Sequence, residues 1–333
     1  MDKIDFLITW VDCNDPKWQK EHNYYAALEN REVDNSSARF RDWDTLRYWF
    51  RGVEKFAPWV NNIFFVTCGH VPEWLDVNHP KLKIVKHSEY IPAEYLPTFN
   101  SNVIEFFFHK IEGLSEHFVY FNDDMFILDY ISSERFFKNG LPCDMGEVGI
   151  KPDTDIFGCS VFIATDLINK YYSPQNVIRK DFSKWCSIKY PILKSLRNYI
   201  LMRKMDLFPR FVDGHLPQGH LKQIFSEVWN YCENDLNRTS HNKFRSYGDV
   251  AFWLIRYWQL VSGHYSPYNI FKDGHPFMIG DVRMSDITDC IRHQKKKLIC
   301  LNDTEAISNF ELCKRKIHEA FDEILSQKCS YEY

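Results

Sequence analysis

The sequence predicts an α/β fold in which helices alternate with the strands of a mostly parallel central sheet. Short apolar runs recur through residues 1–140 and end in polar turns, as buried parallel strands do. Between them, apolar residues repeat at helical spacing. The chain has 333 residues, 45% hydrophobic and 26% charged, and is long enough for one large domain.

The first half begins with the apolar run 4–11, which predicts a buried strand followed by the polar turn Asp12–Pro16. Asp42 is expected to cap a helix, because apolar residues recur at helical spacing from Leu46 to Phe56. Pro58 then ends this helix. The other elements expected in this half are strands at 63–67, 82–85 and 117–121 and a helix at 101–111.

Beyond Pro142 the pattern is less regular. A strand pair is expected within 151–166, and 181–205 indicates a helical, aromatic insertion or lid. The remaining elements expected are helices at 219–231, 248–261 and 304–325 and a strand at 298–301. There is no internal repeat and no low-complexity linker, so residues 1–333 are expected to form a single domain.

Composition excludes several classes of protein. A net charge of −4 gives no reason to expect nucleic-acid binding. We expect no transmembrane segment and no leader, because no apolar stretch reaches spanning length. Ten cysteines can indicate a secreted disulfide scaffold, but here they are scattered from Cys13 to Cys329 along a long chain, which favours reduced thiols in a cytoplasm. No Cys-x-x-Cys pair occurs, so neither a zinc site nor a redox motif is indicated.

Two adjacent carboxylates, Asp123 and Asp124, follow Asn122 at the end of the strand 117–121. Ligands of open α/β sheets bind beyond the carboxyl ends of the strands. Mg²⁺ or Mn²⁺ prefers one or two carboxylates together with phosphate oxygens, so the pair predicts a cation that holds a diphosphate. An ordinary polar turn is the alternative.

A second strand end carries similar oxygens, because Asn302 and Asp303 follow the strand 298–301. If both strands belong to one sheet, their ends are expected to converge on one cation with Asp123 and Asp124. Two unrelated polar turns are the alternative.

Two further segments suit a nucleotide sugar. Asp12 and Asp15 follow the first strand, where a nucleoside or its ribose commonly binds, although Asp15 before a proline is also a good turn residue. Asn100 and Ser101 begin a helix whose N-terminus suits phosphate or sugar hydroxyls. Glu105 lies in that helix as a candidate catalytic or structural acid.

Polar residues in the turns between the later helices are the remaining candidates for catalytic roles. His215 suits removal of a hydroxyl proton, and the planar guanidinium of Arg245 suits a phosphoryl oxygen. A surface or core position is the alternative for any one of the 13 histidines. The basic run 292–297 suits a polyanionic acceptor or a membrane surface, or else a solvated loop.

The chain resembles the Stealth family of sugar-1-phosphate transferases in four blocks that span nearly its whole length. The family includes bacterial capsular and cell-surface polysaccharide phosphotransferases and the catalytic subunit of lysosomal-enzyme N-acetylglucosamine-1-phosphotransferase. The blocks are Ile4–Pro16, Arg39–Phe126, His215–Asp249 and Leu301–Glu332. The second block is the longest, and its order and spacing make the resemblance specific.

The resemblance implies a nucleotide-sugar glycosyltransferase-like fold (GT-A-like, Rossmann) with a helical insertion, a UDP-sugar donor and Mg²⁺ or Mn²⁺. Residues 1–140 are then the nucleotide-sugar-binding part, 141–213 a variable insertion or lid, and 214–333 the part that completes the metal site. The implied catalytic residues are Glu105, Asp124, His215 and Arg245, and the implied metal ligands are Asp123, Asp124, Asn302 and Asp303. The implied donor-binding residues are Trp10, Asp12, Asp15, Arg41, Asn100 and Ser101.

Some positions depart from the family pattern. Cys13 and Asn14 replace a glycine and a small polar residue, Cys68 replaces a polar residue, and Ser88 stands where an acid is frequent. These loop changes remove no carboxylate from the implied site, but they affect the expected choice of donor or acceptor. The accessory modules of the lysosomal-pathway enzyme are absent, which favours a minimal bacterial version.

The expected reaction moves a hexose-1-phosphate or N-acetylhexosamine-1-phosphate from a UDP-sugar to a hydroxyl of a growing, lipid-linked glycan. It forms a phosphodiester between sugars and releases UMP, in capsular or exopolysaccharide synthesis. The alternatives are a metal-dependent glycosyltransferase that releases UDP and an inactive glycan-binding scaffold. The expected location is the bacterial cytoplasm, with peripheral association at the inner face of the cell membrane.

Overall fold

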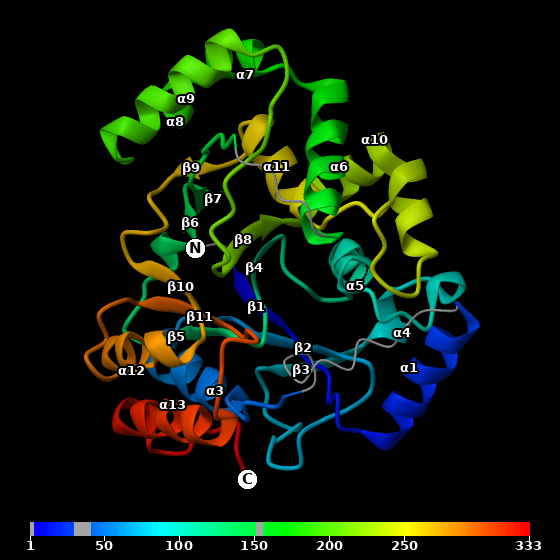
Figure 1. The fold of residues 1–333 in the computed structure, drawn as a ribbon, viewed down its shortest axis with the longest axis vertical. Coiled ribbons are helices and arrows are strands. Elements are labelled where there is room, and N and C mark those ends of the chain that lie inside the picture. The colour runs from blue at the N-terminus through cyan, green and yellow to red at the C-terminus, as the bar shows by residue number, and fades with distance from the viewer. Residues whose placement is uncertain (1–2, 30–40, 151–155) are drawn as a thin grey trace.

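A five-stranded sheet forms the centre of the molecule, with strand order β3-β2-β1-β4-β8 (Figure 1). The computed structural model describes residues 3–29, 41–150 and 156–333. The strands of this sheet are β1 (Ile4–Thr9), β2 (Ile63–Thr67), β3 (Leu82–Lys86), β4 (His117–Phe121) and β8 (Gln218–Leu221). The first four are parallel and β8 is antiparallel to β4, which confirms the mostly parallel sheet. The order 3-2-1-4 is that of a Rossmann half, and it reverses between β1 and β4.

Two smaller sheets adjoin the central one. The order β10-β11-β5 joins β5 (Met125–Ile127), β10 (Gly274–Met278) and β11 (Leu298–Asn302). The order β6-β7-β9 joins β6 (Phe137–Lys138), β7 (Leu141–Asp144) and β9 (Ser266–Pro267). Residues 298–301 and 117–121 therefore lie in different sheets, because β11 pairs with β10 and β5.

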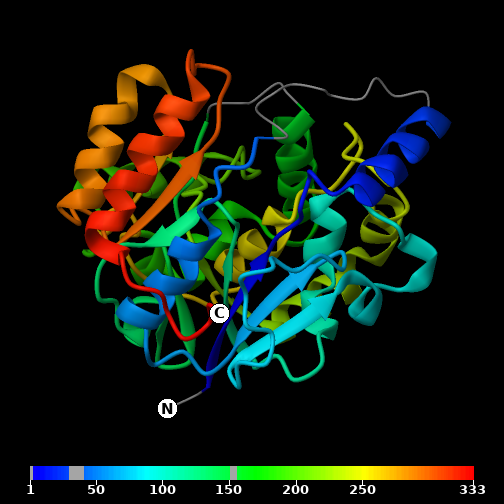
Figure 2. The ribbon, with the colours of Figure 1, turned by 90° about the horizontal axis from the view of Figure 1, so that it is seen from below.

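Helices surround these sheets. Figure 2 shows α12 and α13 together on one side of the molecule and α1 on the opposite side. The α-helices are α1 (Pro16–Leu28), α3 (Leu46–Phe56), α4 (His87–Tyr90), α5 (Ser101–Phe106), α6 (Ile156–Tyr171), α7 (Pro174–Lys180), α8 (Phe182–Trp185), α9 (Ile192–Lys204), α10 (Lys222–Ser240), α11 (Trp253–Val261), α12 (Met284–Arg292) and α13 (Phe310–Leu325). Short 3₁₀ turns lie at Ala93–Tyr95, Phe108–Lys110, Ser133–Arg135 and Asp281–Arg283.

Several predicted elements differ from the observed ones. The strand pair expected within 151–166 is wrong from Ile156 onward, where α6 begins; residues 151–155 lie outside the described chain. A short apolar run does not distinguish a strand from a buried helix. The helix expected at 219–231 begins instead as β8, since this segment pairs with β4 before α10 starts at Lys222.

Helix starts account for most of the remaining differences. The sequence prediction missed α1, although Asp15 caps it and Pro16 occupies its first turn. Asp42 does not cap α3, because its carboxylate accepts from the backbone N–H of Asp44 at 2.7 Å in a tight turn. The helices expected from 248 and 304 begin later, at Trp253 and Phe310.

An aromatic core supports the carboxyl ends of β1 and β4. Phe6 and Phe121 pack with ring centroids 4.8 Å apart, and Trp49 of α3 meets Phe121 at 5.5 Å. All three side chains are completely buried. Each such ring removes a large apolar area from water, so the strand ends that precede the functional site are rigidly held.

Two further observations concern the whole described chain. All ten cysteines are free thiols. Within residues 3–29, 41–150 and 156–333, no helix is long and apolar enough to cross a bilayer.

Candidate functional site

The chain passes from the central sheet to the second sheet at Asp123 and Asp124. These residues join β4 to β5, beside the point where the strand order reverses. Trp10 lies at the matching end of β1, because its backbone N–H continues the pairing with Val66. A crevice at such a reversal is the usual ligand site of an open α/β sheet.

The end of β11, which belongs to the second sheet, contacts the segment that carries Asp123 and Asp124. The backbone N–H of Leu301 donates to the carbonyl oxygen of Asp124 at 2.8 Å. Asp303, two residues later, lines the same cavity of about 230 Å³ as Asp123 and Asp124. The predicted convergence of the two strand ends therefore occurs, although the strands belong to different sheets.

Asp303 is held by cationic and aromatic donors. The guanidinium of Arg41 donates to both carboxylate oxygens, at 3.1 and 3.2 Å, and the indole N–H of Trp43 donates at 3.0 Å. Arg41 lines the cavity beside Asp303. This bidentate pair fixes both side chains, since a planar guanidinium matches a carboxylate in geometry.

Asn302 is placed differently. Its side-chain amide donates to the carbonyl oxygen of Phe277 at 3.3 Å, which attaches it to β10. It does not line the cavity that holds Asp123, Asp124 and Asp303. Its expected role as a metal ligand stays a prediction.

A second cavity, of about 320 Å³, adjoins the first. The two share Trp10, Asp123 and Asp124 in their walls. The second cavity is also lined by the remaining predicted catalytic residues and a donor-binding residue: Ser101, Glu105, His215 and Arg245. Asp123 and Asp124 thus lie between the cavity that contains Arg41 and the cavity that contains Arg245.

Glu105 is a buried acid on α5. The hydroxyl of Tyr120 donates to its carboxylate at 2.8 Å. Burial raises the pKa of Glu105 to about 7, while this hydrogen bond and the charge of Arg245 oppose the rise. Arg245 itself donates to the hydroxyl of Ser101 at the start of the same helix. Near pH 7 this carboxyl can therefore hold or release a proton.

His215 is held by an unusual backbone conformation. Its φ is +42°, in the left-handed region that few non-glycine residues adopt. At the preceding Gly214, an added Cβ would lie 2.3 Å from the side chain of Ile270. Burial, with a contribution from Arg245, lowers the pKa of His215, so the imidazole is neutral at pH 7.

A buried ion-pair network anchors the loop that carries His215. Arg256 on α11 is 1% exposed, and it pairs with Asp144 at 2.7 Å and with Asp213 at 3.0 Å. The hydroxyl of Tyr257 donates to the other oxygen of Asp213 at 2.7 Å. Asp213 is two residues before His215, so the network fixes where the loop enters the cavity.

One oxygen at the strand tip lacks a partner. Oδ1 of Asp124 is buried and, among the described residues, accepts no hydrogen bond. Burial, with repulsion from Asp123, raises the pKa of Asp124 to about 7. Desolvation by the surrounding protein raises the pKa of Asp123 to about 6, with repulsion from Asp42, although the residue itself is exposed. Carboxylates with raised pKa values and an unsatisfied oxygen fit a divalent cation, which would neutralise their charge.

Cys300 is a neighbour of Asp124 that the sequence prediction missed. Ligand atoms of Asp124, His215 and Cys300 lie within 4.8 Å of one another. Burial and the nearby carboxylate of Asp124 hold the pKa of the Cys300 thiol far above its usual range, so the thiol stays protonated beside Asp124. The alternation of side chains along a strand, which places Cys300 on the same face as Asn302, was the available signal.

Three predicted donor-binding residues line neither of these two cavities. Asp12 accepts from the backbone N–H of Asn14 in a turn, and Asp15 caps α1. Asn100 is completely buried, where it caps α5 and donates to Asp249 at 2.7 Å. Their contact with a nucleotide sugar stays a prediction, beside a clear structural role for each.

One family model matches a part of the chain that contains some of these residues. The family described as "Stealth protein CR2, conserved region 2" matches residues 39–143, which include Arg41, Glu105, Asp123 and Asp124. Residues 39 and 40 of that match lie outside the described chain.

Curated relatives match over the full length. The capsular polysaccharide phosphotransferase WcwK of Streptococcus pneumoniae is 42% identical over 100% of this chain and 98% of its own. The receptor polysaccharide phosphotransferase WefC of Streptococcus oralis is 38% identical over 100% of both chains. The exopolysaccharide phosphotransferase cps2G of Lactiplantibacillus plantarum is 36% identical over 99% of this chain and 96% of its own. Among solved structures, mouse xyloside xylosyltransferase 1 aligns with 90% of this chain at 11% identity and a TM-score of 0.35.

Proposed function

The chain belongs to the Stealth family, and from this membership we propose that it transfers a hexose-1-phosphate or N-acetylhexosamine-1-phosphate from a UDP-sugar to a hydroxyl of a growing, lipid-linked glycan. The product is a phosphodiester between sugars, formed in capsular or exopolysaccharide synthesis at the inner face of a bacterial membrane. The observation that carries the proposal is the carboxylate pair Asp123–Asp124 between two cavities, each of which contains an arginine.

The proposed chemistry is attack on the β-phosphorus of the donor. The acceptor oxygen forms a new P–O bond, the bond from this phosphorus to the bridging oxygen breaks, and UMP leaves with that oxygen. Charge then accumulates on the phosphoryl oxygens. Arg245 lines the cavity and supplies positive charge for these oxygens.

We propose Mg²⁺, or Mn²⁺, as the cofactor. Asp123 and Asp124 would hold it, with Asp303 as the third carboxylate of the same cavity. When bound, the ion supplies charge neutralisation for the diphosphate. The unpartnered oxygen of Asp124 supports this assignment. Arg41 keeps Asp303 in position, and Asn302 remains a predicted ligand.

The acceptor hydroxyl must lose a proton as the new bond forms. His215 is favoured as the group that takes it, because its lowered pKa leaves the imidazole neutral and able to accept. Glu105 and Asp124 are the other candidates for this role. Glu105 already accepts a hydrogen bond from Tyr120 at 2.8 Å, and Asp124 is assigned to the cation.

The nucleotide product distinguishes the proposed reaction from its alternatives. The purified protein is incubated with a panel of UDP-sugars, Mg²⁺ and a glycan acceptor, and the products are separated by chromatography. Release of UMP supports the proposal. Release of UDP instead identifies attack on the anomeric carbon and overturns it. If the folded protein turns over none of the donors, the inactive glycan-binding scaffold is the alternative that remains.

A further inference from the structure

Helix α9 turns several large apolar side chains to solvent, although its Met202 is completely buried. Ile192, Leu193 and Leu196 are 82%, 75% and 52% exposed, whereas Asn198 is completely buried. A helix that packs on its own core shows the opposite arrangement. The exposed side of α9 is therefore suited to a contact outside this chain.

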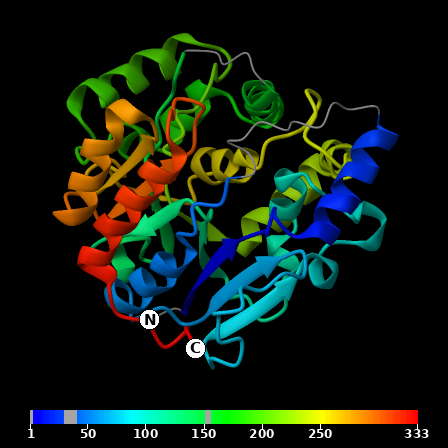
Figure 3. The same ribbon diagram turned by 60° about the horizontal axis from the view of Figure 1, so that its bottom comes forward.

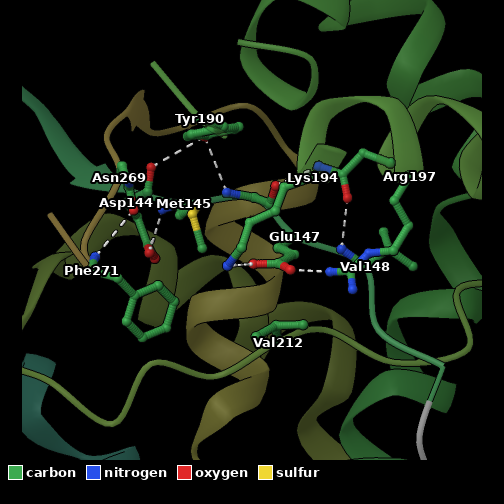
Figure 4. Close-up of polar contacts among 12 residues, drawn as sticks. Asp144, Met145, Glu147, Val148, Tyr190, Lys194, Arg197, Val212, Asn269 and Phe271 are labelled. Carbon is green, nitrogen blue, oxygen red and sulfur yellow. Dashed lines mark hydrogen bonds and ion pairs between the residues drawn. The ribbon is translucent and has the colours of Figure 1, made fainter. Parts of the chain in front are cut away.

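Polar contacts fix α9 in this orientation (Figure 4). Lys194 and Arg197 both pair with the buried carboxylate of Glu147, Lys194 at 2.8 Å. The side-chain oxygen of Asn198 accepts from the backbone N–H of Val148 at 2.9 Å. These contacts lie on the inward side of the helix, so rotation that buried the apolar residues would leave the buried carboxylate of Glu147 without its partners.

Exposed apolar residues also precede and follow α9 in the sequence. We define the docking face as the residues Ile188, Ile192, Leu193, Leu196, Ile200 and Leu207. Each of the six is at least 42% exposed, and Ile188 is fully exposed. Figures 1 and 3 show α7 to α9 as an arm at the top of the molecule, away from the central sheet. Scattered single apolar residues are common on surfaces, but such a cluster indicates a partner.

The segment that carries the docking face is strongly basic. Ten Lys and Arg but only two Asp lie between Lys170 and Arg210, in a chain with a net charge of −4. Arg203 and Lys204 are exposed at the end of α9, and neither forms a salt bridge within the described residues. The partner is therefore expected to be anionic as well as apolar.

We propose that α9 docks the protein on an anionic lipid membrane, with the docking face at the boundary between headgroups and acyl chains. An outward apolar face flanked by Lys and Arg is the pattern of helices that lie in a membrane interface. A second copy of the chain is a poorer partner, because it would bring two basic segments together. The inference rests on the proposed function, whose lipid-linked acceptor lies at such a surface, and it identifies the face of the protein that contacts the membrane.

Vesicle sedimentation tests this docking without any turnover. The full chain is mixed with vesicles of phosphatidylglycerol and phosphatidylcholine, or of phosphatidylcholine alone. We expect binding to the anionic vesicles. Combined replacement Ile192→Ser, Leu193→Ser and Leu196→Ser is expected to weaken binding at least about tenfold, because three apolar side chains no longer insert. Replacing Arg203 and Lys204 by Ser is expected to weaken it about tenfold.

Two controls match these variants outside the segment. Val282→Ser removes an apolar residue that is 95% exposed, and replacement of Lys17 and Lys20 by Ser removes two exposed charges. Both are expected to bind vesicles as the unaltered chain does. Circular dichroism and thermal unfolding establish that every variant is folded.

The outcomes separate docking from the reaction. Absence of binding to anionic vesicles, or equal loss of binding in the control variants, overturns the proposal. A dimer that the apolar variant disrupts, without vesicle binding, assigns the face to a second copy and also overturns it. Because no turnover is measured, vesicle binding stands or fails independently of whether UMP is the product.

Discussion

The backbone N–H of Leu301 donates to the carbonyl oxygen of Asp124 at 2.8 Å, and this bond joins two strand ends that lie far apart in the sequence. It brings Asp303, with its partner Arg41, to the cavity that contains Asp123 and Asp124. The site therefore depends on β11 being in register with β5. A cation held there would also bind the two sheets together.

Asp124→Asn tests the proposed cation site. The amide keeps the size of the side chain but loses the charge, so we expect UMP release to fall at least about a hundredfold while the fold is retained. Chelation of divalent cations should have the same effect on the unaltered chain, and added Mg²⁺ should reverse it. Asp129→Asn, at the far end of β5, is the matched control. Full activity of Asp124→Asn, or in the presence of chelator, would contradict the metal assignment.

Gly214→Ala tests the placement of His215. The added methyl group would lie 2.3 Å from the terminal methyl of Ile270, so either that packed side chain or the loop that carries the imidazole must shift. We expect kcat to fall about tenfold or more, with a smaller change in KM for the donor. Gly248→Ala is the control, because nothing lies within 4 Å of its added Cβ. Equal activity of the two variants would show that the loop tolerates the change.

Glu105→Gln should change how stability depends on pH. The pKa of Glu105 is raised from 4.5 to about 7, so the folded protein binds this proton more tightly than the unfolded chain does. The protonated acid therefore stabilises the folded protein at low pH, and this stability is lost as pH rises from about 4.5 to about 7. The loss is about 1.4 kcal/mol for each unit by which folding raises the pKa. We expect the variant to gain stability relative to the unaltered chain at pH 8 and to lose that advantage at pH 4.

Urea unfolding of both proteins at pH 4, 6 and 8 measures this difference. The Gln side chain still accepts from the hydroxyl of Tyr120, so the hydrogen bond is not removed. A difference in stability that stays constant across the three pH values would show that Glu105 is ionised like an exposed acid.

Arg256→Ala should strongly destabilise the protein. The guanidinium is buried and pairs with Asp144 and Asp213, so its removal leaves two buried carboxylates without a counter-charge. We expect a loss of about 3 to 5 kcal/mol in the free energy of unfolding. Arg292→Ala is the matched control, because its pair with Glu323 is solvent-exposed and is worth about 1 kcal/mol or less. Similar losses for the two variants would contradict the anchoring role of Arg256.

Residue patterns in the sequence predicted those parts of the molecule that depend on local rules. Apolar runs with polar ends identified β1, β2, β3, β4 and β11, because buried parallel strands are continuously apolar. Helix starts were less accurate, as at Asp42 and Asp15. A capping side chain and a turn side chain make the same short hydrogen bonds, so only the path of the chain distinguishes them.

The fold class and the chemical character of the site follow from residue type and order, from which Asp123, Asp124, Glu105, His215 and Arg245 are recognisable. Which of these groups meet depends on long-range packing. The pairing of β11 with β5, the proximity of Cys300 to Asp124 and the hydrogen bond from Val148 to Asn198 of α9 all join segments that are distant in the sequence. Contacts of this kind depend on packing between elements, which local residue patterns do not encode.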